Sequence, residues 1–331
     1  MTTEMQQFWE TRDRLMRTGS VERMETFLTQ WQQKMETKGN FLDWASVTNE
    51  KGLFYRKIGL FEESISVMES LRKALLKERG RHSPEYASLL NNLGGTYRKM
   101  GDKDTAIALF EESLAIYKAQ ARLNVSVCAS LYLNLSQVYQ EKGELEKAAK
   151  RLEESLRYFL LSGRQKDVGR VYYQLAFLYY RMDEGDKTDQ YIEKALSEFR
   201  LHGDRKNPYY AAALNGLGGI LYQKAAYEKA AQVYHEAAAY LLKFYGKTHE
   251  YAINRQHEAW ALRGMGRIQD AREALLEAGI VCKGLYGKEN EKVRAVYDEL
   301  AMIDKELAEH RERATLSLIH ISEPTRLDVI S

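Results

Sequence analysis

The side chains in this sequence that could perform chemistry do not stand at the spacings that chemistry requires. His249 and His257 are eight residues apart, whereas two histidines that bind zinc from one helix stand four apart. The glycines within residues 216–219 suggest a phosphate-binding loop, but they fall inside a predicted helix with no strand before it. The acidic pair Glu111-Glu112 fits a solvated helix face. We therefore expect no catalytic residue, no metal and no cofactor, and we predict that the chain is not an enzyme.

Small residues recur along the chain at steps of 40 to 42 residues. They occupy one position, called here the small column, in six copies of a pattern: Gly52, Gly94, Ser136, Ala176, Gly218 and Ala259. Three positions later stands a larger packing residue: Tyr55, Tyr97, Tyr139, Tyr179, Leu221 and Leu262. Sixteen positions after the small column comes a large apolar residue, called here the knob column: Met68, Phe110, Leu152, Ile192, Tyr234 and Leu275. Because helices approach closely only where one carries a small side chain, each copy is predicted to be a packed helix pair.

Glycine marks the predicted turn between the two helices of most copies, since it takes the left-handed conformation that closes a helix. The turn glycines are Gly59, Gly101, Gly143 and Gly266. In the fourth copy the turn glycine is expected to shift to Gly185, and the fifth copy, with Ala225-Ala226, is expected to turn in another way. Pro84 and Pro208 are predicted at the first position of a helix, where a missing amide donor does no harm.

The copy that spans residues 90–117 carries the signature of a known repeat. Leu90, Leu93, Gly94 and Tyr97 have the spacing L-x2-L-G-x2-Y, and Ala106, Phe110 and Ser113 follow at A-x3-F-x2-small. This pattern resembles the tetratricopeptide repeat, and the period near 42 residues resembles the kinesin-light-chain type of that repeat. The resemblance covers about residues 40–285. It implies an all-α fold, a right-handed α-solenoid of helix-turn-helix repeats with a concave groove, and it does not imply a motor protein as the partner.

The two ends of the chain fit the repeat poorly. We expect residues 1–39 to form a degenerate helical repeat that caps the array, since Arg12 stands at the small position. Residues 40–289 are predicted to hold the six repeats, and residues 290–315 a capping helix in which Ala301 takes the small position. Residues 316–331 include LSLIHISEPTR, which resembles a translated sequencing adaptor. We expect them to be a non-native, disordered tail in place of native sequence.

In this repeat family the first helix of each pair lines the concave face, so the resemblance implies which side chains point into the groove. The predicted partner-binding residues are Asn49, Arg56, Asn91, Asn92, Arg98, Asn134, Gln137, Tyr173, Gln174, Phe177, Tyr180, Asn215, Tyr222, His257 and Trp260. Amide side chains both donate and accept, so they could hold the backbone of an extended peptide. We expect a peptide that is acidic beside the arginines and apolar beside the aromatic residues. The alternative is that these side chains form only a solvated face or pack between repeats.

A solenoid without catalytic motifs still offers a binding surface. We therefore expect an interaction scaffold or adaptor whose partner is a protein or peptide. One alternative is a peptide-sensing regulator, because the arrays resemble those of bacterial peptide-pheromone receptors. Another is the non-catalytic part of a truncated multidomain protein. The two-carboxylate clamp of chaperone-binding tetratricopeptide domains is absent, because its lysine and asparagine positions carry residues such as Asn91 and Gly95.

Bulk composition narrows the partners and the compartment. A net charge of +2 over 331 residues is too small to favour nucleic acid or an anionic membrane. No apolar run approaches the ~18 residues of a membrane span, and the N-terminus lacks a signal-peptide pattern. Cys128 and Cys282 are expected to be reduced, buried thiols. We therefore expect a cytoplasmic protein with no nucleic-acid or membrane partner.

Overall fold

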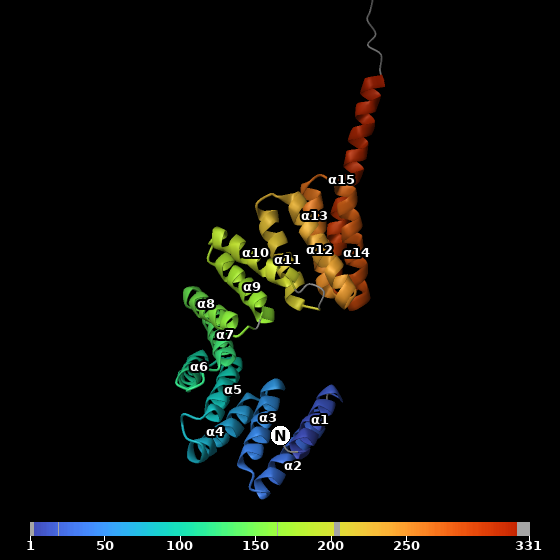
Figure 1. Cartoon of the computed structure of the whole chain (residues 1–331). Helices are drawn as coiled ribbons and strands as arrows, with labels where there is room; N and C mark the ends of the chain where they lie inside the picture. Colours follow the sequence, from blue (N-terminus) through green and yellow to red (C-terminus); the bar gives the residue numbers. More distant parts are fainter. Residues whose placement is uncertain (1–2, 19, 164, 202–205, 323–331) are drawn as a thin grey trace, which may run out of the picture. The chain divides into compact units, whose positions relative to one another are not determined.

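The computed structural model describes residues 3–18, 20–163, 165–201 and 206–322. Within these ranges the chain forms fifteen α-helices and no strand, which confirms the predicted all-α fold (Figure 1). The chain divides into two compact units, Met1–Val171 and Tyr172–Ser331, and the boundary falls within helix α9 (Gln165–Arg181). Among the described residues, no helix combines the length and apolarity needed to cross a membrane.

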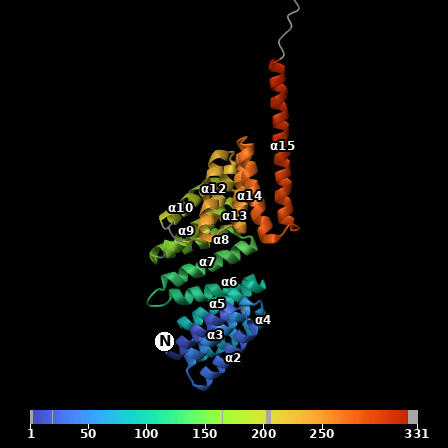
Figure 2. The ribbon, with the colours of Figure 1, turned by 90° about the vertical axis from the view of Figure 1, so that its right-hand side faces the viewer.

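The helices of each unit follow one another in packed pairs. Those of the first unit are α1 (Thr3–Thr18), α2 (Val21–Thr37), α3 (Phe41–Lys57), α4 (Phe61–Glu78), α5 (Pro84–Met100), α6 (Lys103–Lys118), α7 (Val125–Lys142) and α8 (Leu145–Leu161). Those of the second unit, after α9, are α10 (Gly185–Leu201), α11 (Pro208–Gln223), α12 (Tyr227–Tyr245), α13 (His249–Gly264), α14 (Ile268–Tyr286) and α15 (Glu291–Ser322). Figure 2 shows α5, α6, α7 and α8 stacked in chain order.

The small column lies where the two helices of a pair meet, as the sequence predicts. A Cβ atom added to Gly94 in α5 would lie 3.0 Å from Cε1 of Phe110 in α6. One added to Gly218 in α11 would lie 2.5 Å from Cε1 of Tyr234 in α12. Gly52 meets Met68 in the same way, at 2.7 Å from its Cγ. Glycine thus lets a large side chain of the partner helix lie directly against the helix backbone.

The size of the small residue matches the size of its knob. Glycine faces Met68, Phe110 and Tyr234, the bulky or aromatic knobs. The copies that carry serine or alanine instead have the aliphatic knobs Leu152, Ile192 and Leu275. Both columns are buried throughout. The volume of each pair is therefore conserved along the chain although the individual residues change.

All six turns use the left-handed conformation seven positions after the small column. Gly59, Gly101, Gly143 and Gly266 take it as predicted. The expectation for the fourth and fifth copies is wrong, because Asp183 has φ 58° and Ala225 has φ 57° at this same position. Gly185 instead begins helix α10. In each copy the next residue donates its amide to the carbonyl of the packing residue at 2.9–3.0 Å, so the turn geometry is set by hydrogen bonds rather than by glycine.

The left-handed alanine predicts a stabilising substitution. A non-glycine residue in this conformation costs roughly 1–2 kcal/mol, while glycine loses roughly 0.5–1 kcal/mol more entropy on folding. Ala225→Gly should therefore raise the free energy of unfolding by up to ~1 kcal/mol, measured by urea unfolding with circular dichroism. Ala301→Gly, in the middle of α15, is the control and should lower it by about 1 kcal/mol. A loss at both positions would contradict the assignment of strain to Ala225.

Polar side chains begin several helices, and two prolines begin helices as predicted. Ser83, Asn207 and Thr248 cap α5, α11 and α13, and each side chain accepts a backbone amide of the first turn. Pro84 and Pro208 are the first residues of their helices. These local signals explain why the first helix of each of these pairs begins where it does.

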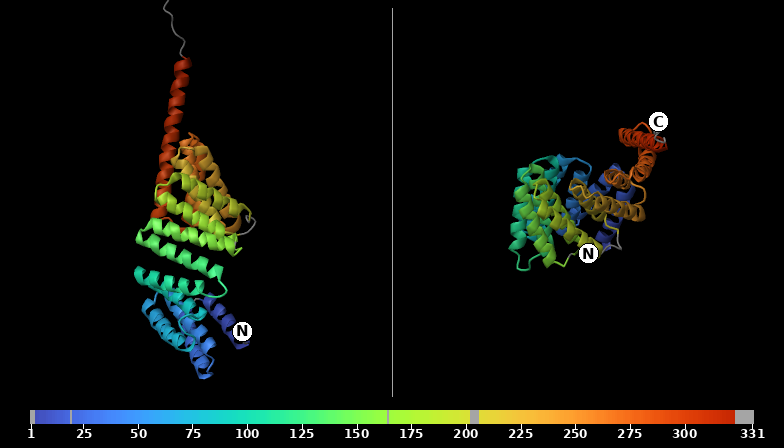
Figure 3. Two further views of the ribbon diagram at one scale, coloured as in Figure 1. Left: turned by 60° about the vertical axis from the view of Figure 1, so that its left-hand side comes forward. Right: turned by 90° about the horizontal axis from the view of Figure 1, so that it is seen from above.

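The helices at the two ends of the chain depart from the repeat pattern. Arg12, at the small position of α1, is half-buried and pairs with Glu50 of α3 at 2.7 Å. Ala301 is exposed on α15, which packs on α14 through the buried residues Val293, Val296 and Leu300. Helix α15 extends beyond the ends of α12, α13 and α14 (Figures 1 and 3). It continues to Ser322, so residues 316–322 are helical where we expected disorder, and residues 323–331 lie outside the described residues.

Candidate functional site

The predicted asparagines of the first unit bind one another across neighbouring repeats. Asn92 of α5 donates to Oδ1 of Asn49 in α3 at 2.9 Å, and Asn134 of α7 donates to Oδ1 of Asn91 in α5 at 2.9 Å. Both pairs are 43 residues apart and half-buried. Because each asparagine has two donors and one acceptor oxygen, Asn92 and Asn134 retain their oxygens. This asparagine ladder thus joins α3, α5 and α7.

The two predicted arginines have different partners. Arg98 of α5 donates to the side-chain oxygen of Gln137 at 2.5 Å and lies 3.4 Å from Glu141, so residues of α7 already satisfy it. Arg56 of α3 donates instead to the backbone carbonyl of Asn92 at 3.0 Å. Burial, together with the nearby charge of Arg98, lowers the pKa of Arg56. Arg56 is therefore a partly desolvated cation with a neutral hydrogen-bond partner.

Five of the predicted residues line one pocket in the second unit. This aromatic pocket has a volume of about 270 Å³. Its main lining residues are Tyr173, Phe177 and Tyr180 from α9, Asn215, Gly216, Gly219 and Gln223 from α11, Tyr234 from α12 and His257 from α13. The three α9 aromatics are three and four residues apart, which places them on one helix face. A Cβ atom on Gly219 would meet only the Tyr234 hydroxyl, at 3.8 Å, so α11 leaves space in front of that face.

The aromatic pocket is electrically neutral. None of the described residues that line it is Asp, Glu, Lys or Arg. Burial raises the pKa of Tyr234 to about 12 and also raises that of Tyr173, so both phenols keep their protons. Burial lowers the pKa of His257, which favours the uncharged imidazole. Asn215 lies between His257 Nδ1 and Oδ1 of the buried Asn254, each at 3.0 Å, and thereby joins α11 to α13.

The remaining predicted residues of the second unit lie outside this pocket. Tyr222 is partly exposed and packs edge-on against Tyr227. Trp260 lies 4.8 Å from the His257 ring between centroids, and its indole donates to Glu299 of α15 at 3.0 Å. Gln174 has a buried Oε1 for which the described residues offer no hydrogen-bond partner. Helix α15 thus supplies the polar partner of Trp260, which the sequence did not predict.

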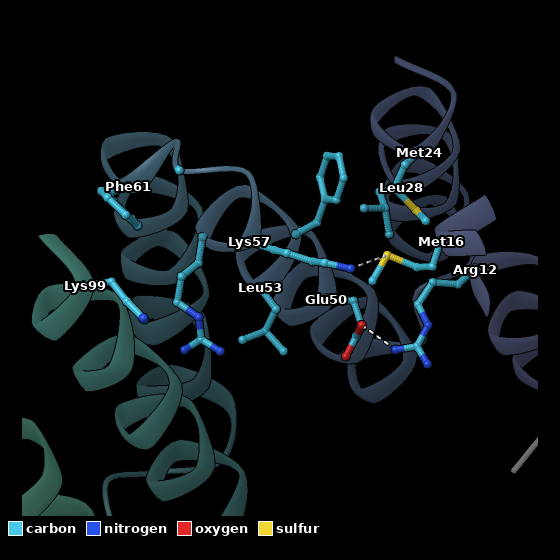
Figure 4. A pocket seen from close by; sticks show the side chains of 12 residues that line it. Arg12, Met16, Met24, Leu28, Glu50, Leu53, Lys57, Phe61 and Lys99 are labelled. Atoms are coloured by element: carbon cyan, nitrogen blue, oxygen red, sulfur yellow. Dashed lines mark hydrogen bonds and ion pairs between the residues drawn. The ribbon is translucent and has the colours of Figure 1, made fainter. Parts of the chain in front are cut away.

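A second pocket lies in the first unit among α1, α2, α3, α4 and α5 (Figure 4). This cationic pocket has a volume of about 540 Å³. It is lined by Arg12, Met16, Met24, Leu28, Glu50, Leu53, Phe54, Arg56, Lys57, Gly59, Phe61 and Lys99. Only Arg56 of this set was predicted. The recurrence of Arg-Lys near the end of α3 and α5 would have indicated Lys57 and Lys99, whereas nothing in the repeat pattern places α1 beside them.

The helix pairs and their columns define the class of protein. Residues 44–119 and 129–158 match family models of the tetratricopeptide repeat. Together with the paired helices, these matches show that the chain contains tetratricopeptide repeats. Its repeats are similar to those of a kinesin-light-chain-related protein. Protein KINESIN LIGHT CHAIN-RELATED 2 of Arabidopsis thaliana is 27% identical over 158 residues, which is 47% of this chain but only 24% of that relative's length.

Solved structures share the fold at low sequence identity. BtubC (BKLC) from P. vanneervenii superposes with a TM-score of 0.60 at 18% identity, over 70% of this chain and 94% of that one. A signal transduction ATPase with numerous domains from Pyrococcus horikoshii, which has a tetratricopeptide repeat sensor, superposes with a TM-score of 0.67 at 17% identity. That match covers 96% of this chain and 49% of the other. Both similarities establish an α-solenoid fold.

Proposed function

We propose that this protein is a non-catalytic interaction protein that binds an extended segment of a partner protein along the first helices of its repeats. The observation that carries the proposal is the aromatic pocket, where Phe177 and Tyr180 are 48% and 46% exposed. Large aromatic side chains are usually buried in a folded protein, so neighbouring aromatic residues that stay exposed indicate a binding surface. Aromatic residues are also the usual anchors of interfaces.

The chemistry of the aromatic pocket selects the part of a partner that would enter it. A neutral pocket lined by rings and by α11 backbone at Gly216 and Gly219 favours an uncharged apolar side chain, because a charge would lose its hydration without gaining a counter-ion. Tyr173 and Asn215 line the pocket, and each has a polar group that can pair with the peptide backbone beside that side chain. We therefore infer an extended peptide with one apolar anchor residue at this position.

Substitution of Phe177 tests the proposal. Peptides selected from a random phage-displayed library on the immobilised protein should bind Phe177→Ala at least ~10-fold more weakly in fluorescence polarisation, since anchor residues contribute about 1–2 kcal/mol or more. Ile280→Ala is the matched control, because Ile280 is 56% exposed in the same unit but lines none of these pockets. Both variants should stay folded, since removal of a half-exposed side chain costs at most ~1 kcal/mol of stability. Equal affinity of Phe177→Ala and the parent protein for every selected peptide would rule out this pocket.

The asparagine ladder favours a sensor as the second candidate. A peptide that uses the amides of Asn92 or Asn134 competes with the bonds that join α3, α5 and α7. Binding there would alter the packing between repeats, whereas binding in the aromatic pocket would not. Hydrogen exchange distinguishes the two functions, because only a sensor should show changed amide protection along α5 when peptide binds.

A further inference from the structure

The cationic pocket holds three positive charges that no ion pair in the described part of the chain engages. Arg12 and Glu50 neutralise each other at 2.7 Å. Arg56 donates to a backbone carbonyl, and Lys57 has only the sulfur of Met16 at 3.8 Å. Lys99 lies on the opposite side of the pocket from Arg12 (Figure 4). The pocket therefore carries an excess of three positive charges.

Arg56 has the most to gain from an anion. It is half-buried, and its guanidinium approaches the backbone of α5 so closely that a Cβ atom on Gly95 would lie 2.6 Å from Nη1. The cation is therefore held in place and partly removed from water without a counter-charge. An anion in the pocket would restore the lost electrostatic stabilisation, and the planar guanidinium suits a group with several acceptor oxygens.

The rest of the pocket wall is apolar. It includes Met16 of α1, Met24 and Leu28 of α2, Leu53 and Phe54 of α3, and Phe61 of α4. Figure 4 shows Leu53 between Lys99 and Arg12. A free inorganic ion would leave this wall in contact with water. The complementary ligand therefore carries an anion and an apolar group on one short framework.

We propose that the cationic pocket binds a phosphorylated tyrosine side chain of a partner protein. A phosphomonoester carries about −1.5 to −2 charges and three acceptor oxygens, so it neutralises more of the pocket's excess positive charge than a single carboxylate does. The phenyl ring covers the apolar wall directly beside the phosphate. The proposal does not depend on the aromatic pocket, which belongs to the other unit and takes an uncharged group.

Small probes test the proposal on the full chain by isothermal titration calorimetry. N-acetyl-phosphotyrosine amide should bind at least ~10-fold more tightly than inorganic phosphate, N-acetyl-tyrosine amide or N-acetyl-glutamate amide, because only the first has both parts. Equal affinity for inorganic phosphate means that the apolar wall is not used, and equal affinity for the glutamate probe means a carboxylate site. Either result, or no binding of the phosphotyrosine probe, overturns the proposal. The proposal is also overturned if the protein binds phosphatidic acid vesicles and not the phosphotyrosine probe.

Paired variants locate the binding. Lys57→Gln with Lys99→Gln should weaken phosphotyrosine binding at least ~10-fold, since both ammonium groups lie on the exposed rim and the fold is not expected to change. Lys73→Gln with Lys150→Gln is the control, which removes the same charge from exposed positions of α4 and α8. Equal weakening by both pairs would show a general charge effect and sink the proposal.

Discussion

Gly218→Ala should destabilise the protein, and the same substitution should stabilise it once Tyr234 has been replaced by leucine. The added Cβ atom would lie 2.5 Å from Cε1 and 2.8 Å from Cδ1 of the Tyr234 ring. That ring is buried between α11 and α12, so relieving the overlap costs about 1–3 kcal/mol. This exceeds the gain of about 1 kcal/mol that alanine has over glycine in a helix.

Leucine at position 234 changes the sign because it reproduces another copy of the repeat. In the sixth copy Ala259 stands opposite Leu275, and both are fully buried. In the Tyr234→Leu background the new methyl group fills space instead of overlapping a ring, so only the helix gain remains. The coupling energy of the double-mutant cycle should therefore reach about 2 kcal/mol.

Urea unfolding of the parent protein, Gly218→Ala, Tyr234→Leu and the double variant, followed by circular dichroism, measures that coupling. Gly284→Ala is the control, because a Cβ atom at Gly284 in α14 meets no atom within 4 Å and φ there is not left-handed. It should stabilise the protein by up to ~1 kcal/mol. If Gly218→Ala behaves like Gly284→Ala, the small column does not set the distance between paired helices.

Phe110→Ala should lower the free energy of unfolding by about 3–5 kcal/mol. Phe110 is 1% exposed, and its ring lies against the backbone of α5 at Gly94. Truncation leaves a cavity between Gly94 and the new alanine, and neither residue has a side chain that could move into it. The loss should therefore fall at the upper end of the usual range for a buried aromatic residue.

Phe177→Ala is the matched control for the same measurement. Phe177 is 48% exposed, so its removal should cost at most ~1 kcal/mol of stability while it weakens peptide binding. The two phenylalanines thus separate a residue that packs helices from one that is available to a partner. Similar losses of stability for the two variants would mean that Phe177 belongs to the core, which would remove the main support for the aromatic pocket as a binding site.

The turns show where sequence reasoning succeeds and where it stops. Four turn glycines were predicted at the residues that take the left-handed conformation. Asp183 and Ala225 were missed, because the prediction looked for the residue that prefers this conformation. The hydrogen bonds from Glu184 to Tyr179 and from Ala226 to Leu221 impose the conformation whatever residue stands there. Local hydrogen bonding in the turn therefore overrides a conformational preference of roughly 1–2 kcal/mol.

The candidate sites divide in the same way. Tyr173, Phe177, Asn215 and His257 were predicted as groove residues, and the structure brings them to one pocket of the second unit. The asparagines of the first unit were predicted from the same positions. The side-chain oxygens of two of them, however, accept hydrogen bonds from asparagines of the next repeat. The repeat pattern does not distinguish a residue that lines a pocket from one that binds another side chain. The outcome depends on a residue of a neighbouring repeat, about 40 positions away.

The sequence by itself determined the helix pairs, their period and the matched sizes of small residue and knob. These features depend on contacts within one repeat, so the same pattern recurs in the residues of every copy. Only the tertiary structure decided that Arg98 is satisfied by α7 while Arg56 is not, and that α1 closes a pocket around Arg56, Lys57 and Lys99. The physical reason is that a side chain is free or occupied according to what packs beside it, and α1 does not follow the repeat.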